Sequence, residues 1–414
     1  MKTRMLVGVF LFSLMTACGG IDGSPTSTPT PMPIPTNTPQ PTTPPRALEV
    51  VYVRDGNIWL WVEGAGNSAL TTVGGVSEVR ISEDGVWIAY LQNDQLWLTR
   101  PDIAPSPNPS EYPKLLVSAE SRIVQFDFDP QSKNIYFTAF INGVAGGLDL
   151  FRIRVDLPLP VRVVGPGLGG NYHISPDGQC LAITRPNQLD LWCQPDPQPR
   201  RVFEFAYECG FGVQTGPDIR WTAASDGFYV VAPVCDDNTL HGRERLYFVP
   251  RNGTAPQVKA EFVGWTYDPV FIAPDGTHLA SLIDYGDLKS LHIIGVNGSD
   301  ATYISLPSDD ITFRGWATDS RHFIVWLKQS MLYNSFTGPL IASLDEMPVP
   351  LLTEDLDTTL PGPTISDVNW VSDSRFLFLR DGLWIETLKS TMVPIDATPG
   401  ARIASYDFSP KPGP

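Results

Sequence analysis

Four of the five cysteines, those after Cys18, are candidates for disulfide bonds. Two of them fit a predicted strand pairing. Cys180 and Cys193 bound two short apolar runs that join around Pro186-Asn187. A hairpin that turns there puts Cys180 opposite Cys193, since both lie equally far from the turn, and opposed strand residues come within disulfide reach. We therefore predict a Cys180–Cys193 disulfide, with Cys209–Cys235 as the second pair and four free core thiols as the alternative. The spacings are too long for a zinc cluster.

Histidine and tryptophan side chains are the next candidates for ligand binding. His173 lies in a short strand that we expect to be the innermost of its unit, where it either binds a ligand or packs. Trp265 lies outside the repeat described below and is a candidate for stacking on a sugar ring in a rim pocket. His278, His292 and His322 occupy recurring positions of that repeat, which indicates structural roles.

Two acidic stretches and one glycine-rich stretch are the remaining candidates for binding ions or phosphate. Neither Asp236-Asp237-Asn238 nor Glu354-Asp355-Leu356-Asp357 has the alternating oxygen ligands and glycine turn of a calcium loop. The run Gly165–Gly170 leads into a predicted strand, whereas a phosphate cradle needs a helix N-terminus. The sequence therefore predicts no metal ligand, cofactor or catalytic residue. Asp236 and Asp237 remain candidates for a ligand surface.

These candidates are positioned by a repeat whose marker is an aliphatic residue followed by an aromatic one. The mean spacing of the marker is about 46 residues, close to the roughly 40–45 of four-stranded propeller blades. The pairs are Ile58-Trp59, Leu96-Trp97, Leu150-Phe151, Leu191-Trp192, Leu246-Tyr247, Leu291-His292, Leu332-Tyr333 and Leu383-Trp384. An Asp-containing turn such as Ser175-Pro176-Asp177-Gly178 precedes seven of the pairs, after a short strand with one apolar face. Arg314 interrupts that apolar face.

The two ends of the repeat region complement each other. The first unit begins directly at Glu49–Val53 and lacks the strand that precedes the Asp turn, whereas Arg402–Pro410 is such a strand with no unit after it. Pairing them completes an eighth blade and removes two unpaired sheet edges. We therefore predict an all-β fold, an eight-bladed β-propeller of four-stranded antiparallel blades spanning residues 47–410. Seven blades, with the unit around Asp129 parsed wrongly, is the alternative.

The N-terminal residues predict export and a tether. Charged Lys2 and Arg4 precede an apolar stretch that is shorter than the roughly 20 residues of a membrane-spanning helix. The stretch ends at Cys18 in a pattern that resembles the bacterial lipoprotein signal, which implies cleavage after residue 17 and lipidation of Cys18. Residues 18–46 are dominated by Pro and Thr, so we expect a disordered tether there.

The unit Ser-Pro-Asp-Gly, apolar strand, Leu-aromatic pair resembles the WD-like propeller repeats of TolB and of the propeller domain in dipeptidyl-peptidase-IV-type enzymes. The resemblance implies the fold and says little about function. TolB-like proteins carry a separate N-terminal domain and usually six blades, whereas this sequence has a tether and eight units. The peptidase relatives add an α/β-hydrolase domain, and this sequence has no Gly-x-Ser-x-Gly motif.

A net charge of −16 argues against nucleic acid and against adsorption to anionic lipid. We expect a monomer that a lipid anchors to the outer face of the cell membrane, or on the periplasmic side in a two-membrane bacterium. We expect it to act as a binding or scaffold module for a protein, peptide or cell-envelope glycan. The expected contact segments are Tyr207–Gly216, Asp236–Arg245 and Glu354–Pro363. The alternative is a glycoside hydrolase or polysaccharide lyase, which needs two carboxylates converging at the mouth of the ring.

Overall fold

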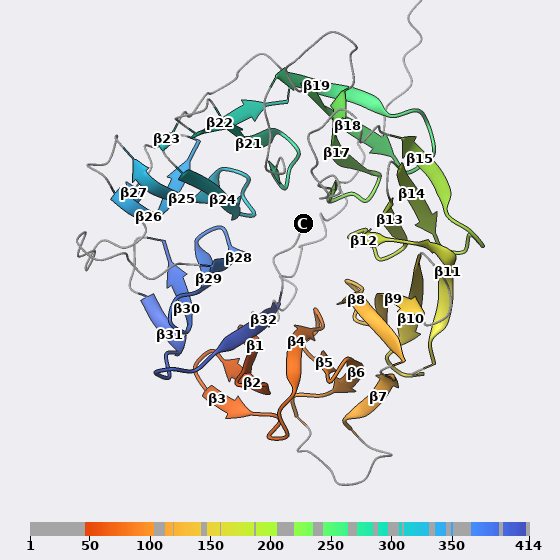
Figure 1. Ribbon diagram of the computed structural model, residues 1–414, viewed down its shortest axis with the longest axis vertical. Coiled ribbons are helices and arrows are strands. Elements are labelled where there is room, and N and C mark those ends of the chain that lie inside the picture. Colours follow the sequence, from red (N-terminus) through yellow and green to blue (C-terminus); the bar gives the residue numbers. More distant parts are fainter. Residues whose placement is uncertain are drawn as a thin grey trace, which may run out of the picture. The chain divides into compact units, whose positions relative to one another are not determined.

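The computed structural model contains only strands, turns and irregular segments among the residues that it describes. The described residues are 46–102, 112–118, 120–141, 147–157, 159–185, 188–204, 219–234, 243–263, 271–284, 289–296, 306–308, 310–330, 336–344, 349–350, 366–388 and 392–410. The strands form eight four-stranded antiparallel sheets arranged as a ring (Figure 1). The structure confirms the eight-bladed propeller and excludes the seven-bladed alternative.

Blades are numbered here in chain order, and the first contains strands from both ends of the propeller. Blade 1 contains β1 (Glu49–Arg54), β2 (Asn57–Val62), β3 (Gly66–Ala69) and β32 (Ile403–Ser409). Blade 2 contains β4 (Val76–Ile81), β5 (Ile88–Gln92), β6 (Gln95–Thr99) and β7 (Lys114–Val117). Blade 3 contains β8 (Ser121–Phe128), β9 (Asn134–Ile141), β10 (Leu148–Arg154) and β11 (Val161–Gly169). Blade 4 contains β12 (Asn171–Ile174), β13 (Cys180–Arg185), β14 (Gln188–Cys193) and β15 (Arg200–Glu204).

The second half of the ring repeats the same order of strands. Blade 5 contains β16 (Ile219–Trp221), β17 (Gly227–Val234), β18 (Arg243–Pro250) and β19 (Gln257–Val263). Blade 6 contains β20 (Phe271–Ile272), β21 (His278–Asp284), β22 (Lys289–Gly295) and β23 (Leu306–Ser308). Blade 7 contains β24 (Asp310–Trp316), β25 (His322–Ser330), β26 (Phe336–Ser343) and β27 (Val349–Pro350). Blade 8 contains β28 (Ser366–Ser372), β29 (Arg375–Leu379), β30 (Leu383–Thr387) and β31 (Met392–Asp396).

The turn Ser175–Gly178 shows why each blade folds back after its first strand. The Gly178 amide donates to the Ser175 carbonyl at 2.8 Å, and Gly178 adopts a φ of +68°, which glycine accepts without strain. The Ser175 hydroxyl donates to the Asp177 carboxylate at 2.6 Å and accepts from the Cys180 amide at 2.9 Å. Local side-chain bonds therefore start β13 directly opposite β12.

The apolar core lies between adjacent blades rather than at the centre of the ring. One cluster of buried side chains joins Val51 and Ile58 of blade 1 to Val79 and Tyr90 of blade 2. Another joins Leu98 of blade 2 to blade 3. Each blade thus buries its faces against two neighbours, which is how a ring of small sheets acquires a continuous core.

The first strands of the blades lie around the centre of the ring, and no described strand pairs with their inner edges (Figure 1). Side chains from the following blade satisfy several of these edges. The indole Nε1 of Trp221 donates to the His173 carbonyl at 3.0 Å, and that of Trp316 donates to the Phe271 carbonyl at 3.1 Å. These bonds protect edges that would otherwise remain open to pairing.

Blade 1 is closed by the pairing of β1 with β32, which is called the seam below. The register runs from Glu49 opposite Ser409 to Arg54 opposite Ile403. The strand order β3-β2-β1-β32 confirms that the two ends of the repeat region share one blade. The carboxylate of Asp407 also accepts from the Ile81 amide at 2.9 Å, so β32 contacts blade 2 as well.

Candidate functional site

A cavity of about 370 Å³ lies among the first strands of three consecutive blades, beside the seam. It is called the inner cavity below, and it is lined by Ser77, Glu78, Arg80, Asp367, Asn369, Ala404, Ser405 and Tyr406. These residues belong to β4, β28 and β32. The site therefore combines residues from the beginning and the end of the propeller, and it depends on closure of the ring.

Each strand that lines the inner cavity has a β-bulge at a lining residue. The register of β4 shifts between Val76 and Glu78, which leaves Ser77 as the extra residue. The register of β32 shifts between Ile403 and Ser405, around Ala404, and that of β28 shifts between Ser366 and Asn369. Bulges bend a strand and redirect its side chains, and they are frequent beside binding and active sites. Here three of them converge on one cavity.

Bulges in first strands continue on both sides of this site. β8 shifts register between Ile123 and Gln125, and β24 shifts between Phe313 and Gly315. The bulge in β24 explains Arg314, which interrupts the apolar pattern in the sequence: Arg314 is the extra residue, and Phe313 takes the buried position. The arc β24, β28, β32, β4 and β8 is contiguous, and the inner cavity lies at its middle.

Arg80 is the positive centre of the site. Its Nη2 lies 2.7 Å from Oε1 of Glu78, and its Nε lies 3.3 Å from Oδ1 of Asp127 on β8. Burial by itself would lower the pKa of the Arg80 guanidinium, but Asp127, Glu78 and Asp407 together raise it. Burial raises the pKa of the Glu78 carboxyl, Arg80 opposes this, and Asp127 adds to it. Arg80 therefore remains charged, while Glu78 takes up a proton more readily than an exposed glutamate does.

Tyr406 lies on β32, the middle strand of the three, and binds the β28 side of the cavity. Its hydroxyl donates to the backbone carbonyl of Asp367 and accepts from Nδ2 of Asn369 at 2.8 Å. Burial raises the pKa of Tyr406, so the phenol stays neutral and keeps its donor. Asp367 has a φ of +49°, a left-handed conformation that aspartate tolerates better than most residues. The bond from Tyr406 and the bulge together fix Asp367, and its side chain is exposed.

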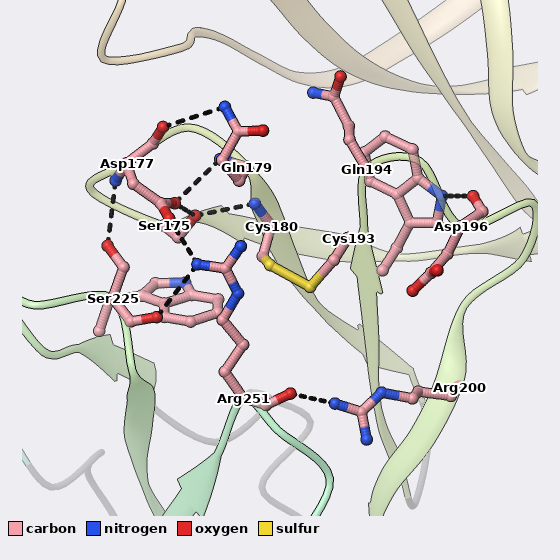
Figure 2. Close-up of a disulfide and its surroundings, with 12 residues drawn as sticks. Ser175, Asp177, Gln179, Cys180, Cys193, Gln194, Asp196, Arg200, Ser225 and Arg251 are labelled. Carbon is pink, nitrogen blue, oxygen red and sulfur yellow. Dashed lines mark hydrogen bonds and ion pairs between the residues drawn. A yellow bond between two sulfur atoms is a disulfide. The ribbon is translucent and has the colours of Figure 1, made fainter.

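The predicted disulfide between Cys180 and Cys193 is present in blade 4. Figure 2 shows it joining the start of β13 to the end of β14, where the two residues are paired across the hairpin. The Arg251 guanidinium donates to the carboxylate of Asp177 beside it, which links the turn of blade 4 to blade 5. Cys209 and Cys235 lie outside the described residues, so their pairing stays a prediction.

The other sequence candidates do not assemble into one site among the described residues. His173 lies on β12, half-buried, and is not among the residues that line the inner cavity. Cys18, Trp265, Asp236 and Asp237 lie outside the described residues. Two of the expected contact segments, 207–216 and 354–363, also lie wholly outside the described residues. Of the expected segment Asp236–Arg245, residues 236–242 lie outside them.

The sequence reasoning missed Glu78, Arg80, Asp367 and Tyr406. The short C-terminal strand contains Ser405, Tyr406 and Asp407, and such polar residues in a first strand were the available signal. The bulges could not be read from the sequence. Within the described part of the chain, no three His, Cys, Asp or Glu side chains are placed to hold a metal ion. No helix that could cross a bilayer occurs there either.

No protein-family model matches this chain, and no curated protein sequence does. Solved structures do resemble it. A crystal structure of the eukaryotic initiation factor aligns with a TM-score of 0.55 and 13% identity, over 84% of this chain and 85% of that one. TolB from Acinetobacter baumannii aligns with a TM-score of 0.35 and 12% identity, over 61% and 62%. An oligogalacturonate lyase in complex with manganese aligns with a TM-score of 0.46 and 10% identity, over 69% and 81%. At these identities the likeness describes the propeller fold alone.

Proposed function

We propose that this protein is an extracytoplasmic binding module that is anchored by a lipid at Cys18 and holds a polar ligand in the inner cavity. The observation that carries the proposal is the convergence of three bulged strands on one polar cavity. Structural packing alone does not require three consecutive first strands to present Glu78, Asp367 and Ser405 to the same space.

The direction of the strands relates the inner cavity to the expected contact segments. Ser77, Asp367 and Ala404 lie near the start of β4, β28 and β32. Because neighbouring strands are antiparallel, the connections that enter first strands and the hairpins between second and third strands belong to the same face of the ring. In chain order, 207–216 precedes β16, 236–242 lies between β17 and β18, and 354–363 precedes β28. A partner that contacts this face would also reach the cavity.

Residues 24–45 would act as a spacer between the lipid and the propeller. They are nearly all Pro, Thr and Ser, and in polyproline II conformation they would span roughly 68 Å. This length would hold the ring clear of the membrane surface. Cys18→Ser should therefore move the protein from the membrane fraction to the soluble fraction, while ligand binding by the propeller persists.

The test of the proposed site is crosslinking on intact cells that express the full-length chain, followed by mass spectrometry. Ala404→Trp fills the cavity without removing a hydrogen-bonding group, because Ala404 is an exposed lining residue. Leu159→Trp is the control, since Leu159 is 63% exposed and belongs to blade 3 outside the lining. We expect the partner captured by the wild type and by the control to be lost with Ala404→Trp. Unchanged capture by Ala404→Trp would refute the site.

An enzyme that acts on polysaccharide is the second candidate, because Glu78 and Asp367 both line the cavity and burial raises the pKa of Glu78. A glycoside hydrolase uses one carboxyl as a general acid and another as a base or nucleophile. Turnover of cell-envelope glycans by the wild type, lost in both Glu78→Gln and Asp367→Asn, would support this function. Binding of such glycans without turnover would exclude this enzyme activity and support the binding module.

A further inference from the structure

We propose that the ligand of the inner cavity is a basic side chain, lysine or arginine, presented by a polypeptide partner. The inference rests on the proposed function and names the chemistry of the ligand. Three features of the described lining support it: an excess of acidic groups, one carboxylate without a described partner, and little exposed aromatic surface.

The charges around the inner cavity favour a cation. Among the lining residues, Glu78 and Asp367 are acidic and Arg80 is basic. Asp127 and Asp407 lie behind them and interact with Arg80. The lining therefore holds two carboxyl groups and one guanidinium group, with two further carboxyl groups behind it, within a chain of net charge −16. A concave surface with an excess of one sign of charge attracts a ligand of the opposite sign.

Arg80 cannot neutralise all of these carboxylates. Its Nη2 is paired with Glu78, its Nε with Asp127, and its Nη1 donates to the Val79 carbonyl at 3.0 Å. Its donors are thus directed toward β4 and β8, whereas Asp367 lies across the cavity on β28. No described residue forms a hydrogen bond or an ion pair with the Asp367 carboxylate.

Asp367 is fixed at the cavity although its carboxylate has no described partner. The bulge in β28 turns the residue out of the regular pairing, and the Tyr406 hydroxyl binds its backbone carbonyl. The conformation is therefore determined by the neighbouring strand and not by a partner for the side chain. An ammonium or guanidinium group placed here would bind Asp367, with the Ser77 hydroxyl as a further acceptor.

Two alternative ligand classes fit less well. An anion would meet a cation that is already paired and two carboxyl groups in the lining. A neutral sugar usually stacks on an exposed aromatic ring, but Tyr406 is the one aromatic residue in the described lining and is only 8% exposed. A volume of about 370 Å³ has room for one extended basic side chain with some water.

A bound cation would also change the protonation of Glu78. The charged and titratable groups around Glu78 are Arg80 on its own strand, Asp127 on β8, Tyr172 on β12, Asp367 on β28, and Tyr406 and Asp407 on β32. An added positive charge stabilises the Glu78 carboxylate, so binding should release a proton. By linkage, affinity falls as the pH falls through the raised pKa of Glu78.

The experiment is fluorescence anisotropy with the purified full-length protein and three labelled peptides: Lys-Gly-Lys-Gly, Gln-Gly-Gln-Gly and Glu-Gly-Glu-Gly. We expect the lysine peptide to bind, its affinity to fall with added salt, and the other two to bind at least tenfold more weakly. Asp367→Asn should weaken lysine-peptide binding about tenfold, which corresponds to ~1.4 kcal/mol. Asp156→Asn is the matched control, because it removes the same charge from a side chain that is 62% exposed in blade 3. Glu78→Gln should weaken binding and reduce its pH dependence.

The inference is overturned if the lysine and glutamine peptides bind equally, or if Asp367→Asn binds like the Asp156→Asn control while melting like the wild type. These outcomes differ from failure of the proposed function. If Ala404→Trp abolishes partner capture on cells and no lysine peptide binds, the cavity is a binding site of another chemistry. If Ala404→Trp changes neither capture nor peptide binding, the site itself is refuted.

Discussion

Replacing Arg54 by leucine should destabilise the propeller, because the change breaks an ion pair across the boundary between blade 8 and blade 1. The Arg54 Nη1 lies 2.7 Å from Oδ2 of Asp396, at side-chain exposures of 18% and 2%. The guanidinium also lies over the ring of Trp59, 3.4 Å from its centroid. Leucine keeps the apolar contact with Trp59 and leaves the Asp396 carboxylate with a reduced set of partners.

The size of the effect follows from the burial of Asp396. Removing one partner of a buried ion pair costs about 3–5 kcal/mol. The lower end applies here, because Thr398 still donates to Asp396 through its hydroxyl at 2.7 Å and its amide at 3.1 Å. At roughly 2.1 cal/mol/K per residue, a two-state propeller of this size would melt about 4 °C lower.

The pH dependence has a definite sign. Burial by itself would raise the pKa of Asp396, but the bonds from Thr398 and Arg54 lower it below the usual aspartate value. Because the folded pKa is depressed, the carboxylate contributes stability above the unfolded pKa, and this contribution is lost as the pH falls through the folded pKa. Arg54→Leu should therefore lose most stability at neutral pH and approach the wild type in acid.

The assay is urea unfolding of the wild type, Arg54→Leu, Asp396→Asn and the double variant at neutral and acid pH. We expect the two single changes to be non-additive by about 1–2 kcal/mol, since the residues contact each other. Additive effects at neutral pH would show that the pair does not couple blade 8 to blade 1.

Three further changes test other parts of the molecule. Cys180→Ser together with Cys193→Ser should lower the free energy of unfolding by up to about 3 kcal/mol, measured against the wild type with and without reductant. The wild type should be less stable at neutral than at acid pH, because burial raises the pKa of Glu386 to about 7 and its Oε2 has no described partner. Glu386→Gln should remove this pH-dependent difference in stability. Since that folded pKa is raised, the wild type loses up to ~3 kcal/mol as the pH rises through it, and melting curves at pH 5 and pH 8 compare the two proteins. Trp316→Phe keeps most of the ring packing and removes the bond to the Phe271 carbonyl, so it should cost about 1 kcal/mol in urea unfolding.

The fold could be predicted from the sequence because each blade repeats the same local chemistry. The turn Ser175–Gly178 and the Leu191-Trp192 pair mark one blade. The number of times that this unit recurs predicts the number of blades. The complementary ends Glu49–Val53 and Arg402–Pro410 gave the closure, which the β1–β32 register confirms. The Cys180–Cys193 disulfide followed from the same hairpin geometry.

The inner cavity could not be predicted in this way, because it departs from the repeat. A bulge adds one residue to one strand, and nothing in the local sequence of Val76–Glu78 distinguishes it from a regular strand. Glu78 and Asp367 are also separated by most of the chain, so only the closed ring brings them to the same cavity. Conversely, His173 occupies a first strand as expected, and its position alone did not make it part of the site.

Closure of the ring by β32 is the feature on which the cavity and its ligand both depend. The direct measurement is the thermal unfolding of a chain that ends at Arg402 and therefore lacks β32. We predict that the single cooperative transition of the full-length protein is lost. Without β32, β1 exposes an unpaired edge, and the Ile81 amide loses its hydrogen bond to the Asp407 carboxylate. An unchanged transition at the wild-type temperature would contradict the account.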